Sequence, residues 1–530
     1  MWTTTRYTMQ PNSPSFIPRS SSLISIKRTK TFDWKLYNVP AAKPSKLRYL
    51  TLNHCWGRAL FLTLTASTRA AMESGMALQA LPTTFRDAIK VARHLGHDYL
   101  WIDSLCILQD SVEDWRAESA HMQEIDRYSS GTIAASAAAC GDDGCFFARD
   151  PHDAVPAQIA VRWADAVKER DYLLMHSEYF AEQISQAPLN QRAWVVQERI
   201  LSPRTIHFGR SQVFWECGSE LACEAFPREL PQRLRGQEQW LAQYCASQLD
   251  ELEGDVYDSA DDIRERLRKI WSDLVWMYAR CQLTRPEDKL VAMSGLVQRF
   301  YTAFGSFAAP LWGDRYLAGL WESDLPHSLL WSVSDPKRSG AVESVRPPDY
   351  RAPSWSWAVV DAPIQTVRRY YKDRGTCLVE HLSAWAVPLS DDLTGQVSDG
   401  LLRICGRLVQ ATFDSSEERR LCIPDKSFKA DVQPDFPAAL AYDRFFMLLP
   451  VRMFVQTVAD GVDYQYVQGL VLARQHGLDE PENAATSRRA GCWEANAMKN
   501  AQERVRKDSI APLDMDVIWK DCPEIIIEIV

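Results

Sequence analysis

The stretch that most constrains the fold is YLWIDSLCILQDSVEDWRAESAHMQEIDRY at residues 99–128. It opens with an apolar run at 99–102 that ends at Asp103. A short apolar run followed by polar residues and then by helical periodicity is typical of a buried parallel strand. Open α/β sheets bind ligands outside the carboxyl ends of their strands. The sequence therefore predicts that Asp103 lies at the ligand-facing edge of a sheet.

An amphipathic helix is expected directly after this strand. Ser111 and Asp114 have the spacing of a capping box. One helical face then carries the apolar residues Trp115, Met122 and Ile125. Glu118 shares that face, where loss of solvent raises the pKa of a carboxyl group unless a cation pairs with it. Glu118 and Asp103 are therefore candidate catalytic residues, and the alternative is an internal ion pair and a helix cap.

The alternation of strands and helices continues before and after residues 99–128. Residues 48–55 predict a strand that leads into Trp56 and Gly57, a glycine whose backbone can approach a phosphate. A helix is predicted to open at Pro82 and Thr84 and to end at Gly96. The small residues at 132–139 predict a central strand. Alternating strands and helices favour a parallel sheet with right-handed crossovers.

A second informative helix has the sequence QRAWVVQERIL, residues 191–201. It is predicted to begin at the cap residue Asn190 and to end before Pro203. Trp194 and Glu198 are four residues apart and share a face of this helix. Two strands are predicted after it, at 205–208 and 212–217.

With 530 residues, the chain is expected to form two or three domains. The predicted division is a flexible lead-in with first strands at 1–45, an α/β domain at 46–217 with an insertion at 140–187, a helical region at 218–349, and a β-rich region at 350–530. The insertion is expected to carry its own short strands. Polar residues 477–512 predict a mobile loop.

Composition narrows the function classes. The net charge of −9, without a basic cluster, argues against nucleic-acid binding. No apolar stretch reaches the length of a membrane span. The 13 cysteines and the lack of an apolar leader predict free thiols and a cytoplasmic location. The Cys140–Cys145 and Cys217–Cys223 spacings do not fit a zinc site, and Cys106 is a weak candidate nucleophile.

Three blocks of sequence resemble the fungal heterokaryon-incompatibility (HET) domain. They are YLTLNHCWG at 49–57, a long block at 81–115 that continues to Met122, and LNQRAWVVQERILSPRTIHF at 189–208. They occur in the family's order. The downstream phrases LTRPEDKLVAMSGL and APSWSWA resemble segments that commonly follow that domain. The chain departs from the family pattern at Asn53, where serine is usual, and at 126–128, where an aromatic residue and alanine are usual.

The resemblance implies a role in non-self recognition and regulated cell death when unlike fungal strains fuse. It also implies a remote similarity to TIR domains, which have a flavodoxin-like parallel sheet and in some cases cleave NAD. TIR enzymes carry Trp-Cys-x-x-Glu on a helix. Here Trp194 and Glu198 have the same spacing, with Val195 in place of the cysteine. The expected fold class is thus a TIR/flavodoxin-like α/β sheet with flanking helices.

The resemblance also implies a set of site residues. Cleavage of the nicotinamide–ribose bond develops oxocarbenium character, which a carboxylate stabilises. The expected catalytic residues are Glu198, Asp103 and Glu118. The expected NAD-binding residues are Trp56, Gly57, Trp194, Arg192 and Asn53. No cofactor or metal is expected, and NAD would be the substrate of a glycohydrolase-like activity.

Other hypotheses stay open at this point. Trp194 can be a core anchor, and Glu198 can pair with Arg192 or Arg199. The chain can be a non-catalytic signalling module that acts by self-association or by binding a protein partner. A degenerate copy with an unrelated role in its host is a third hypothesis.

Overall fold

The computed structural model describes residues 22–40, 47–150, 156–162, 170–218, 220–235, 244–249, 260–305, 314–335, 344–366, 375–390, 392–413, 420–423, 429–436, 446–457, 463–474, 486–498, 519 and 522–530. The chain divides into two compact units, Met1–Ser247 and Gln248–Val530.

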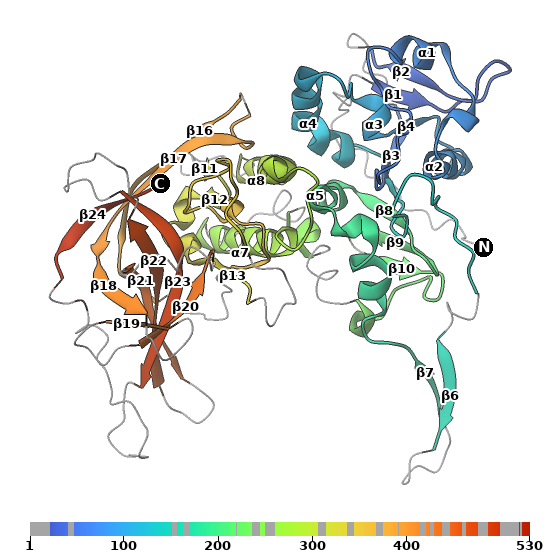
Figure 1. Cartoon of the computed structure of the whole chain (residues 1–530). Coiled ribbons are helices and arrows are strands. Elements are labelled where there is room, and N and C mark those ends of the chain that lie inside the picture. Colours follow the sequence, from blue (N-terminus) through green and yellow to red (C-terminus); the bar gives the residue numbers. More distant parts are fainter. Residues whose placement is uncertain are drawn as a thin grey trace. The chain divides into compact units, whose positions relative to one another are not determined.

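The first unit is built on an eight-stranded mixed sheet (Figure 1). In spatial order its strands are β10 (Leu221–Cys223), β9 (Val213–Cys217), β8 (Arg204–Phe208), β5 (Thr132–Ala134), β3 (Tyr49–Asn53), β4 (Tyr99–Trp101), β1 (Ser22–Ser25) and β2 (Lys35–Asn38). The four central strands β8, β5, β3 and β4 are parallel, and an antiparallel pair closes each edge. The predicted parallel core is confirmed, whereas a wholly parallel flavodoxin-like sheet is not.

The order of the parallel strands decides where a site can form. β3 lies between β4 and β5, so the chain crosses from β3 to β4 in one direction and then returns past β3 to β5. Such a reversal of strand order is a topological switch point, and side chains beyond the carboxyl ends of the strands beside it can reach a common ligand. The residues after β3 and β4 therefore occupy the edge expected to bind ligands.

Helices connect the parallel strands and supply the core. They are α1 (Arg69–Ser74), α2 (Thr83–His94), α3 (Asp103–Cys106), α4 (Val112–Arg127) and α5 (Ala193–Leu201). α2 packs against β3 and β4, and α4 packs against α5. The apolar face of α2 buries Phe85, Ile89 and Ala92 against strand residues such as Leu52 and Leu100. The apolar residues that recur every 3.6 residues in the sequence thus form the buried face of the helix.

Two of the predicted helix starts agree with the structure, and one differs. The Ser111 hydroxyl accepts the Asp114 backbone N–H at 3.1 Å and caps α4, as predicted. The predicted opening of α2 at Pro82 and Thr84 is confirmed: Pro82 holds the cap position and the helix begins at Thr83, although no side chain caps it. The predicted cap at Asn190 is wrong: its side chain donates to the Ile184 carbonyl from a 3-10 turn, η4 (Pro188–Gln191), before α5 begins.

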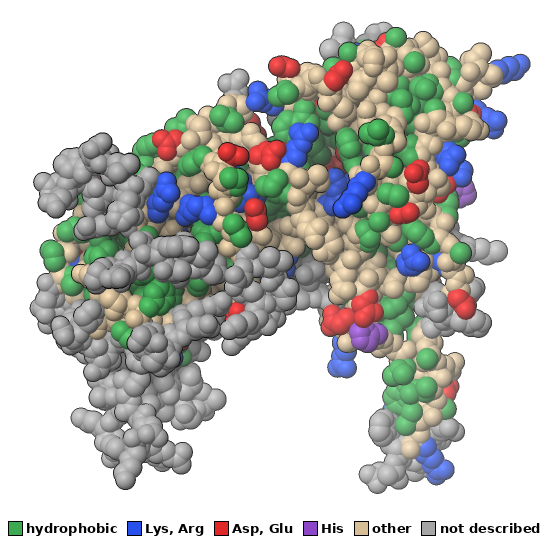
Figure 2. All heavy atoms as spheres, in the orientation of Figure 1, with side chains coloured by type: hydrophobic (Ala, Val, Ile, Leu, Met, Phe, Trp, Pro, Cys, Tyr) green, Lys and Arg blue, Asp and Glu red, His purple; other side chains and the backbone are tan. Residues whose placement is uncertain are grey.

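A two-stranded hairpin projects from the first unit. β6 (Ala157–Val161) and β7 (Arg170–Leu174) pair antiparallel, at the place where short strands were predicted. Both strands are exposed on both faces, and hydrophobic side chains appear on their surface in Figure 2. Leu173 and Leu174 are 65% and 60% exposed. An isolated ribbon of two strands is marginally stable in water.

The second unit begins with helices, as predicted. α7 (Ala260–Tyr278) buries its apolar stripe, which includes Ile263, Leu267 and Leu274, and α8 (Ser294–Gly305) follows. Short strand pairs come next: β11 (Tyr316–Leu317) with β12 (Leu320–Trp321), and β13 (Ser332–Val333) with β14 (Ile364–Gln365).

The β-rich part of this unit is a ten-stranded sheet. Its strands are β15 (Thr376–Cys377), β16 (Glu380–Pro388), β17 (Val397–Arg407), β18 (Val409–Phe413), β19 (Arg420–Cys422), β20 (Lys429–Pro434), β21 (Phe446–Thr457), β22 (Asp463–Arg474), β23 (Thr486–Met498) and β24 (Glu524–Ile529). β18, β19, β20, β23, β22 and β21 pair in a closed ring. The loop predicted at 477–512 is wrong at residues 486–498, which form β23, and its other residues lie outside the described ranges.

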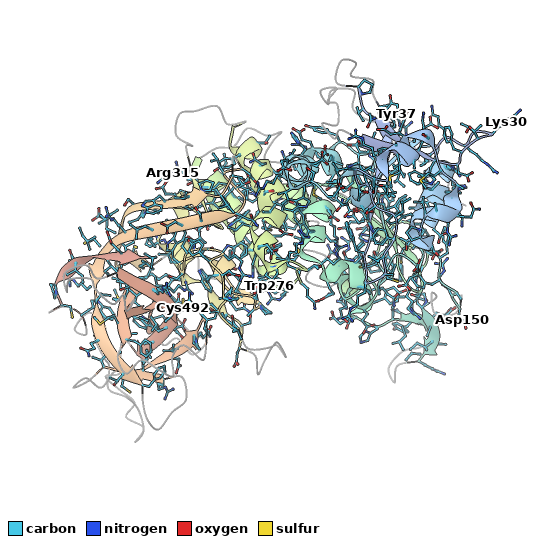
Figure 3. The ribbon with its side chains drawn as sticks, turned by 45° about the horizontal axis from the view of Figure 1, so that its top comes forward. Lys30, Tyr37, Asp150, Trp276, Arg315 and Cys492 are labelled. Atoms are coloured by element: carbon cyan, nitrogen blue, oxygen red, sulfur yellow. The ribbon has the colours of Figure 1, made fainter. Side chains whose placement is uncertain are left out.

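A buried ion pair ties this sheet to the segment before it. The Arg489 guanidinium on β23 contacts the Asp435 carboxylate at 2.8 Å and donates to the carbonyls of Leu329 and Trp331. Cys492, three residues further along β23 and labelled in Figure 3, accepts a hydrogen bond from the same guanidinium at its Sγ. Because Arg489 satisfies several acceptors, its burial is compensated by hydrogen bonds.

Candidate functional site

Two segments that are distant in sequence meet at the carboxyl ends of β3 and β4. The Trp56 indole Nε1 donates a hydrogen bond to the Asp103 carboxylate Oδ2 at 2.8 Å. The other carboxylate oxygen, Oδ1, accepts the Ser104 backbone N–H at 2.7 Å. Asp103 is the first residue of α3, and its side chain keeps 30% exposure. The structure therefore has Asp103 at the sheet edge where the sequence predicted it, with a fixed orientation.

His54 lies behind this pair in an apolar setting. Its ring Nδ1 is 3.7 Å from Asp103 Oδ1, and its ring packs edge-on against Phe85 at 4.7 Å between centroids. Burial lowers the pKa of His54 to about 4, although the Asp103 carboxylate opposes the shift. His54 is therefore a neutral imidazole at physiological pH. It was not among the predicted site residues, because a histidine beside a strand end has no distinguishing spacing.

Arg192 joins the start of α5 to the end of β3. Its guanidinium Nη1 donates to the His54 backbone carbonyl. Its positive charge also acts on Glu198, whose pKa it lowers. The arginine is partly exposed, so part of its donor capacity faces solvent. A guanidinium in this setting can pair with a carboxylate or a phosphate.

Glu198 is half-buried on α5 and makes no side-chain hydrogen bond or ion pair with any residue in the described ranges. Burial raises the pKa of Glu198 to about 7; Arg192 opposes this shift and the negative charge of Asp103 adds to it. The charges of Arg192 and Asp103 both act on Glu198, so the three side chains lie close enough to interact electrostatically. The alternative pairing of Glu198 with Arg199 is wrong, because Arg199 binds the Glu216 carboxylate at 2.8 Å.

Trp194 and Glu118 lie on the helical side of the group. The Trp194 ring packs edge-on against Trp115 of α4, with 6.5 Å between centroids, and it also contacts the core. Glu118 is buried on α4. Its charge and that of Asp103 add to the raised pKa of the Cys106 thiol, which is due mainly to burial. Cys106 is thus a packing thiol without thiolate character, which argues against its role as a nucleophile.

Gly57 and Asn53 have local structural roles. Gly57 has φ of +69°, and a Cβ there would lie 2.5 Å from Cys140 Cβ. The close approach that requires a glycine is therefore made to Cys140. Asn53 is the buried last residue of β3, and its carbonyl accepts the Ala135 N–H at 3.0 Å.

A buried polar chain links α5, β8 and β9 to the segment after β5. The Ser136 hydroxyl lies 3.1 Å from His207 Nδ1, and His207 Nε2 lies 2.8 Å from Glu216 Oε2. This order of groups is that of a hydrolase triad. Ser136 has no exposed surface and His207 has 1%, so a substrate has no access and the chain is structural. Sequence reasoning missed it, and the available signal was a histidine and a glutamate on neighbouring predicted strands.

Asp126, near the end of α4, is a second residue that the predictions left out. It is 1% exposed, and both burial and the negative charge of Glu198 raise its pKa. The available signal was its departure from the family pattern, which usually has an aromatic residue there.

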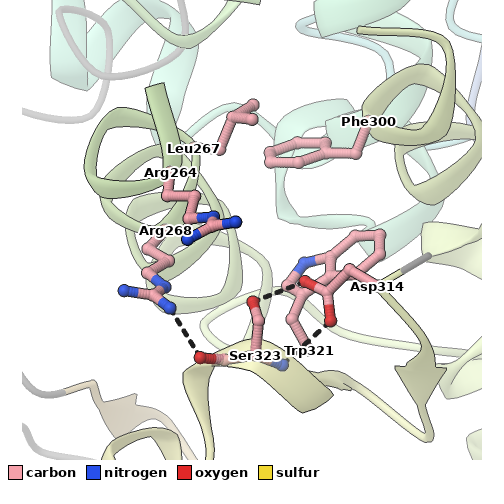
Figure 4. Close-up of a pocket in the computed structure, with 7 residues that line it drawn as sticks. All are labelled: Arg264, Leu267, Arg268, Phe300, Asp314, Trp321 and Ser323. Carbon is pink, nitrogen blue, oxygen red and sulfur yellow. Dashed lines mark hydrogen bonds between the residues drawn. The ribbon is translucent and has the colours of Figure 1, made fainter. Parts of the chain in front are cut away.

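A separate hollow lies in the second unit (Figure 4). Arg264 and Arg268 of α7 line it, and Asp314 accepts two hydrogen bonds from Ser323. Its cavity of about 10 Å³ has room for about one water molecule. None of its lining residues belongs to the predicted site.

Within the described ranges, no group of three or more His, Cys, Asp or Glu residues is arranged to hold a metal ion. Nor does any described helix combine the length and the apolar character that a membrane crossing requires.

The comparisons with known proteins identify one family. Residues 49–198 match the family model described as heterokaryon incompatibility protein (HET). A comparison with curated proteins gave no match, and neither did a comparison with solved structures. The matched range begins with β3 and ends at Glu198, so it contains every predicted site residue. The chain therefore contains, at residues 49–198, a region similar to the HET domain of heterokaryon-incompatibility proteins.

Proposed function

We propose that this chain acts in fungal non-self recognition and regulated cell death, and that its HET domain does so by hydrolysing NAD with Glu198 as the catalytic carboxylate. The observation that carries the proposal is the environment of the Glu198 carboxyl group and its raised pKa. Its carboxyl group has no hydrogen-bonding or ionic partner among the described residues, has a pKa of about 7, and lies near Asp103 and Arg192. Carboxyl groups with pKa values shifted toward neutrality are typical of catalytic acids and bases.

The proposed hydrolysis needs one ionisable carboxylate, which accepts a proton from water. Hydrolysis breaks the bond between the ribose C1′ and the nicotinamide ring nitrogen, and the electron pair of that bond stays on the nitrogen. A water oxygen forms the new bond to C1′. The proton that water releases passes to the Glu198 carboxylate and then to solvent. The products are nicotinamide, ADP-ribose and a proton, and the negative charge of Glu198 stabilises the oxocarbenium character at C1′.

The neighbouring residues can bind the remainder of the dinucleotide. Asp103 holds the Trp56 ring in one orientation, and the partly exposed ring can stack on a base. Arg192 can pair with the diphosphate. Trp194 is partly exposed beside Glu198 on α5. Asn53 is the last residue of β3 at the same edge, Gly57 approaches Cys140, and the charge of Glu118 acts on Cys106.

The proposal is tested with purified protein and in cells. Glu198→Gln is expected to reduce the release of nicotinamide from NAD by about 100-fold or more and to abolish toxicity. Glu178→Gln, at an exposed glutamate in the same matched range, is the control and is expected to leave both unchanged. Because the ionised form is required, the rate of the native protein is expected to rise with pH through about 7. Unchanged toxicity of Glu198→Gln without NAD loss would refute the enzymatic proposal.

A second candidate function is that of a non-catalytic module acting through self-association or a protein partner. The exposed apolar side chains of the β6–β7 hairpin favour it, since exposed apolar patches commonly mark interaction sites. In that case Leu173→Ser with Leu174→Ser would abolish toxicity, while Glu198→Gln would not.

A further inference from the structure

The ribbon that β6 and β7 form has two unlike faces. In an antiparallel pair, opposite residues point to the same face and successive residues alternate between faces. One face therefore carries Ala157, Ile159, Val161, Arg170, Tyr172 and Leu174. The other face carries Gln158, Ala160, Asp171 and Leu173. We call the first the apolar face, because all of its side chains except that of Arg170 are apolar.

The apolar face is open to solvent. Leu174 is 60% exposed and Ile159 is 39% exposed. The chain enters the core only at Met175, directly after β7, where it packs on a cluster that includes Phe180 and Phe214. A two-stranded ribbon becomes stable when further strands or a helix pack against its hydrophobic face. A second layer on the apolar face would therefore stabilise the ribbon.

The two ends of the ribbon carry opposite charges. At the tip, Arg170 is the register partner of Val161, and Arg162 follows β6; both arginines are exposed. At the base, just after β7, the His176 ring Nδ1 lies 3.0 Å from Glu182 Oε1, and the glutamate side chain is 47% exposed. Figure 2 shows acidic side chains beside the base of the ribbon and basic ones at its far end.

This distribution fits a second copy of the same ribbon that runs in the opposite direction. A two-fold axis through the Ile159–Tyr172 pair lays one apolar face on the other and directs Arg170 of each copy toward Glu182 of the other. Because the ribbon projects from the first unit, the bodies of the two copies would lie at opposite ends of the paired ribbons (Figure 1). An anionic surface would attract the tip and repel the base, so it fits less well.

We propose that two copies of this chain associate through the apolar faces of their β6–β7 ribbons, with the basic tip of each ribbon on the acidic base of the other. The five register pairs span about 17 Å, so the contact is much smaller than a standard interface of about 800 Å² per partner. The association is therefore weak and depends on concentration. It gives the second candidate function a partner, a second copy of the chain, and it does not involve Glu198.

Sedimentation equilibrium of the full chain at pH 7 tests the association. The native protein is expected to pass from monomer to dimer with a Kd on the order of 10–100 μM. Leu174→Ser, on the apolar face, is expected to weaken the dimer by about 10-fold or more. Leu173→Ser, on the opposite face of the same strand, is the matched control and is expected to leave it unchanged. A native chain that stays monomeric up to 100 μM, roughly the weakest Kd expected, would overturn the proposal, as would equal effects of the two variants.

Charge reversal tests the antiparallel arrangement. Arg170→Glu and Glu182→Arg each bring like charges together at both ends of the paired ribbons, and each is expected to weaken the dimer by about 3-fold or more. An equal mixture of the two variants restores an opposite charge at both contacts. The mixture is therefore expected to associate as tightly as the native protein, whereas neither variant does so alone. A mixture that associates no better than the separate variants would overturn the proposed orientation.

A membrane is the alternative occupant of the apolar face. If the native chain stays monomeric, binds phosphatidylserine vesicles and loses that binding in Leu174→Ser, the face binds lipid and the proposal is refuted. Sedimentation requires no catalytic activity. A dimer without NAD hydrolysis would thus refute the function of Glu198 and support the association, and a monomer that hydrolyses NAD would do the reverse.

Discussion

At the scale of single residues, the surroundings of a side chain decide its chemistry more than its identity does. His54 and Cys106 belong to the residue types most often used as base and nucleophile. Burial lowers the pKa of the histidine to about 4, which makes its neutral imidazole a weak base, and raises the pKa of the thiol, which keeps the thiol protonated at neutral pH. The same loss of solvent moves the pKa of Glu198 to about 7, where a carboxyl group can act as a base.

Because His54 is buried in its neutral form, the stability of the protein is expected to fall at acidic pH. Its pKa falls from 6.5 to about 4 on folding, so its contribution to stability is present above pH 6.5 and is lost as pH falls toward 4. That loss is worth up to about 3 kcal/mol, since one pKa unit corresponds to about 1.4 kcal/mol. Denaturant unfolding of His54→Gln is expected to show a weaker decline between pH 6.5 and 4 than the native protein.

His94→Gln provides the matched control for this measurement. His94 is an exposed histidine at the end of α2, and its replacement is expected to leave the decline unchanged. Identical pH profiles for the native protein and His54→Gln would contradict the assignment of His54 as a buried, neutral imidazole.

At the scale of elements, the start of α4 depends on one hydroxyl. The Ser111 side chain accepts the Asp114 N–H, while the Asp114 carboxylate turns away to accept the Leu108 N–H at 2.7 Å. The predicted capping box is therefore formed in one direction only. Ser111→Ala is expected to reduce the free energy of unfolding by about 1 kcal/mol. Ser111→Thr keeps the acceptor and is expected to stay within a few tenths of the native value, and equal losses in both variants would contradict the cap.

The turn after β3 depends on Gly57. Alanine at this position would meet two costs, a backbone at φ of +69° and a Cβ placed 2.5 Å from Cys140 Cβ. Gly96 has a similar φ of +75°, and nothing lies within 4 Å of a Cβ built there. Gly96→Ala therefore measures the backbone cost alone, about 1 kcal/mol.

Gly57→Ala is expected to exceed the loss of Gly96→Ala by a further 1–3 kcal/mol, roughly the cost of overpacking, in denaturant unfolding at pH 7. Equal losses would mean that the turn relaxes away from Cys140. In that case a close approach to Cys140 would not explain the glycine.

At the scale of the whole molecule, the two compact units have separate cores. Separate cores are expected to unfold in separate calorimetric transitions. Arg489→Met in the second unit leaves Asp435 buried without its cation, which is expected to cost about 3–5 kcal/mol. This variant is expected to lower one transition, and Gly57→Ala is expected to lower the other. A single transition that both variants shift alike would contradict independent units.

Much of the first unit was predictable because its signals are local. A four-residue apolar run, a 3.6-residue stripe and a capping serine depend on neighbours in sequence, so β4, α2 and α4 appear where they were predicted. The start of α5 was not predictable, since Asn190 found a partner in Ile184 and the helix begins after Arg192, which binds the His54 carbonyl. The cap was decided by contacts outside the helix.

The sequence by itself determined the parallel core, the position of Asp103 at the end of β4, and the shared helical face of Trp194 and Glu198, because each follows from backbone periodicity. Only the tertiary structure decided the charges of the site. Whether Arg199 pairs with Glu198 or with Glu216, and whether the pKa of Asp126 is raised, depends on which strands and helices pack together. Desolvation and Coulomb interactions act through space, and the spacing of residues along the chain does not determine them.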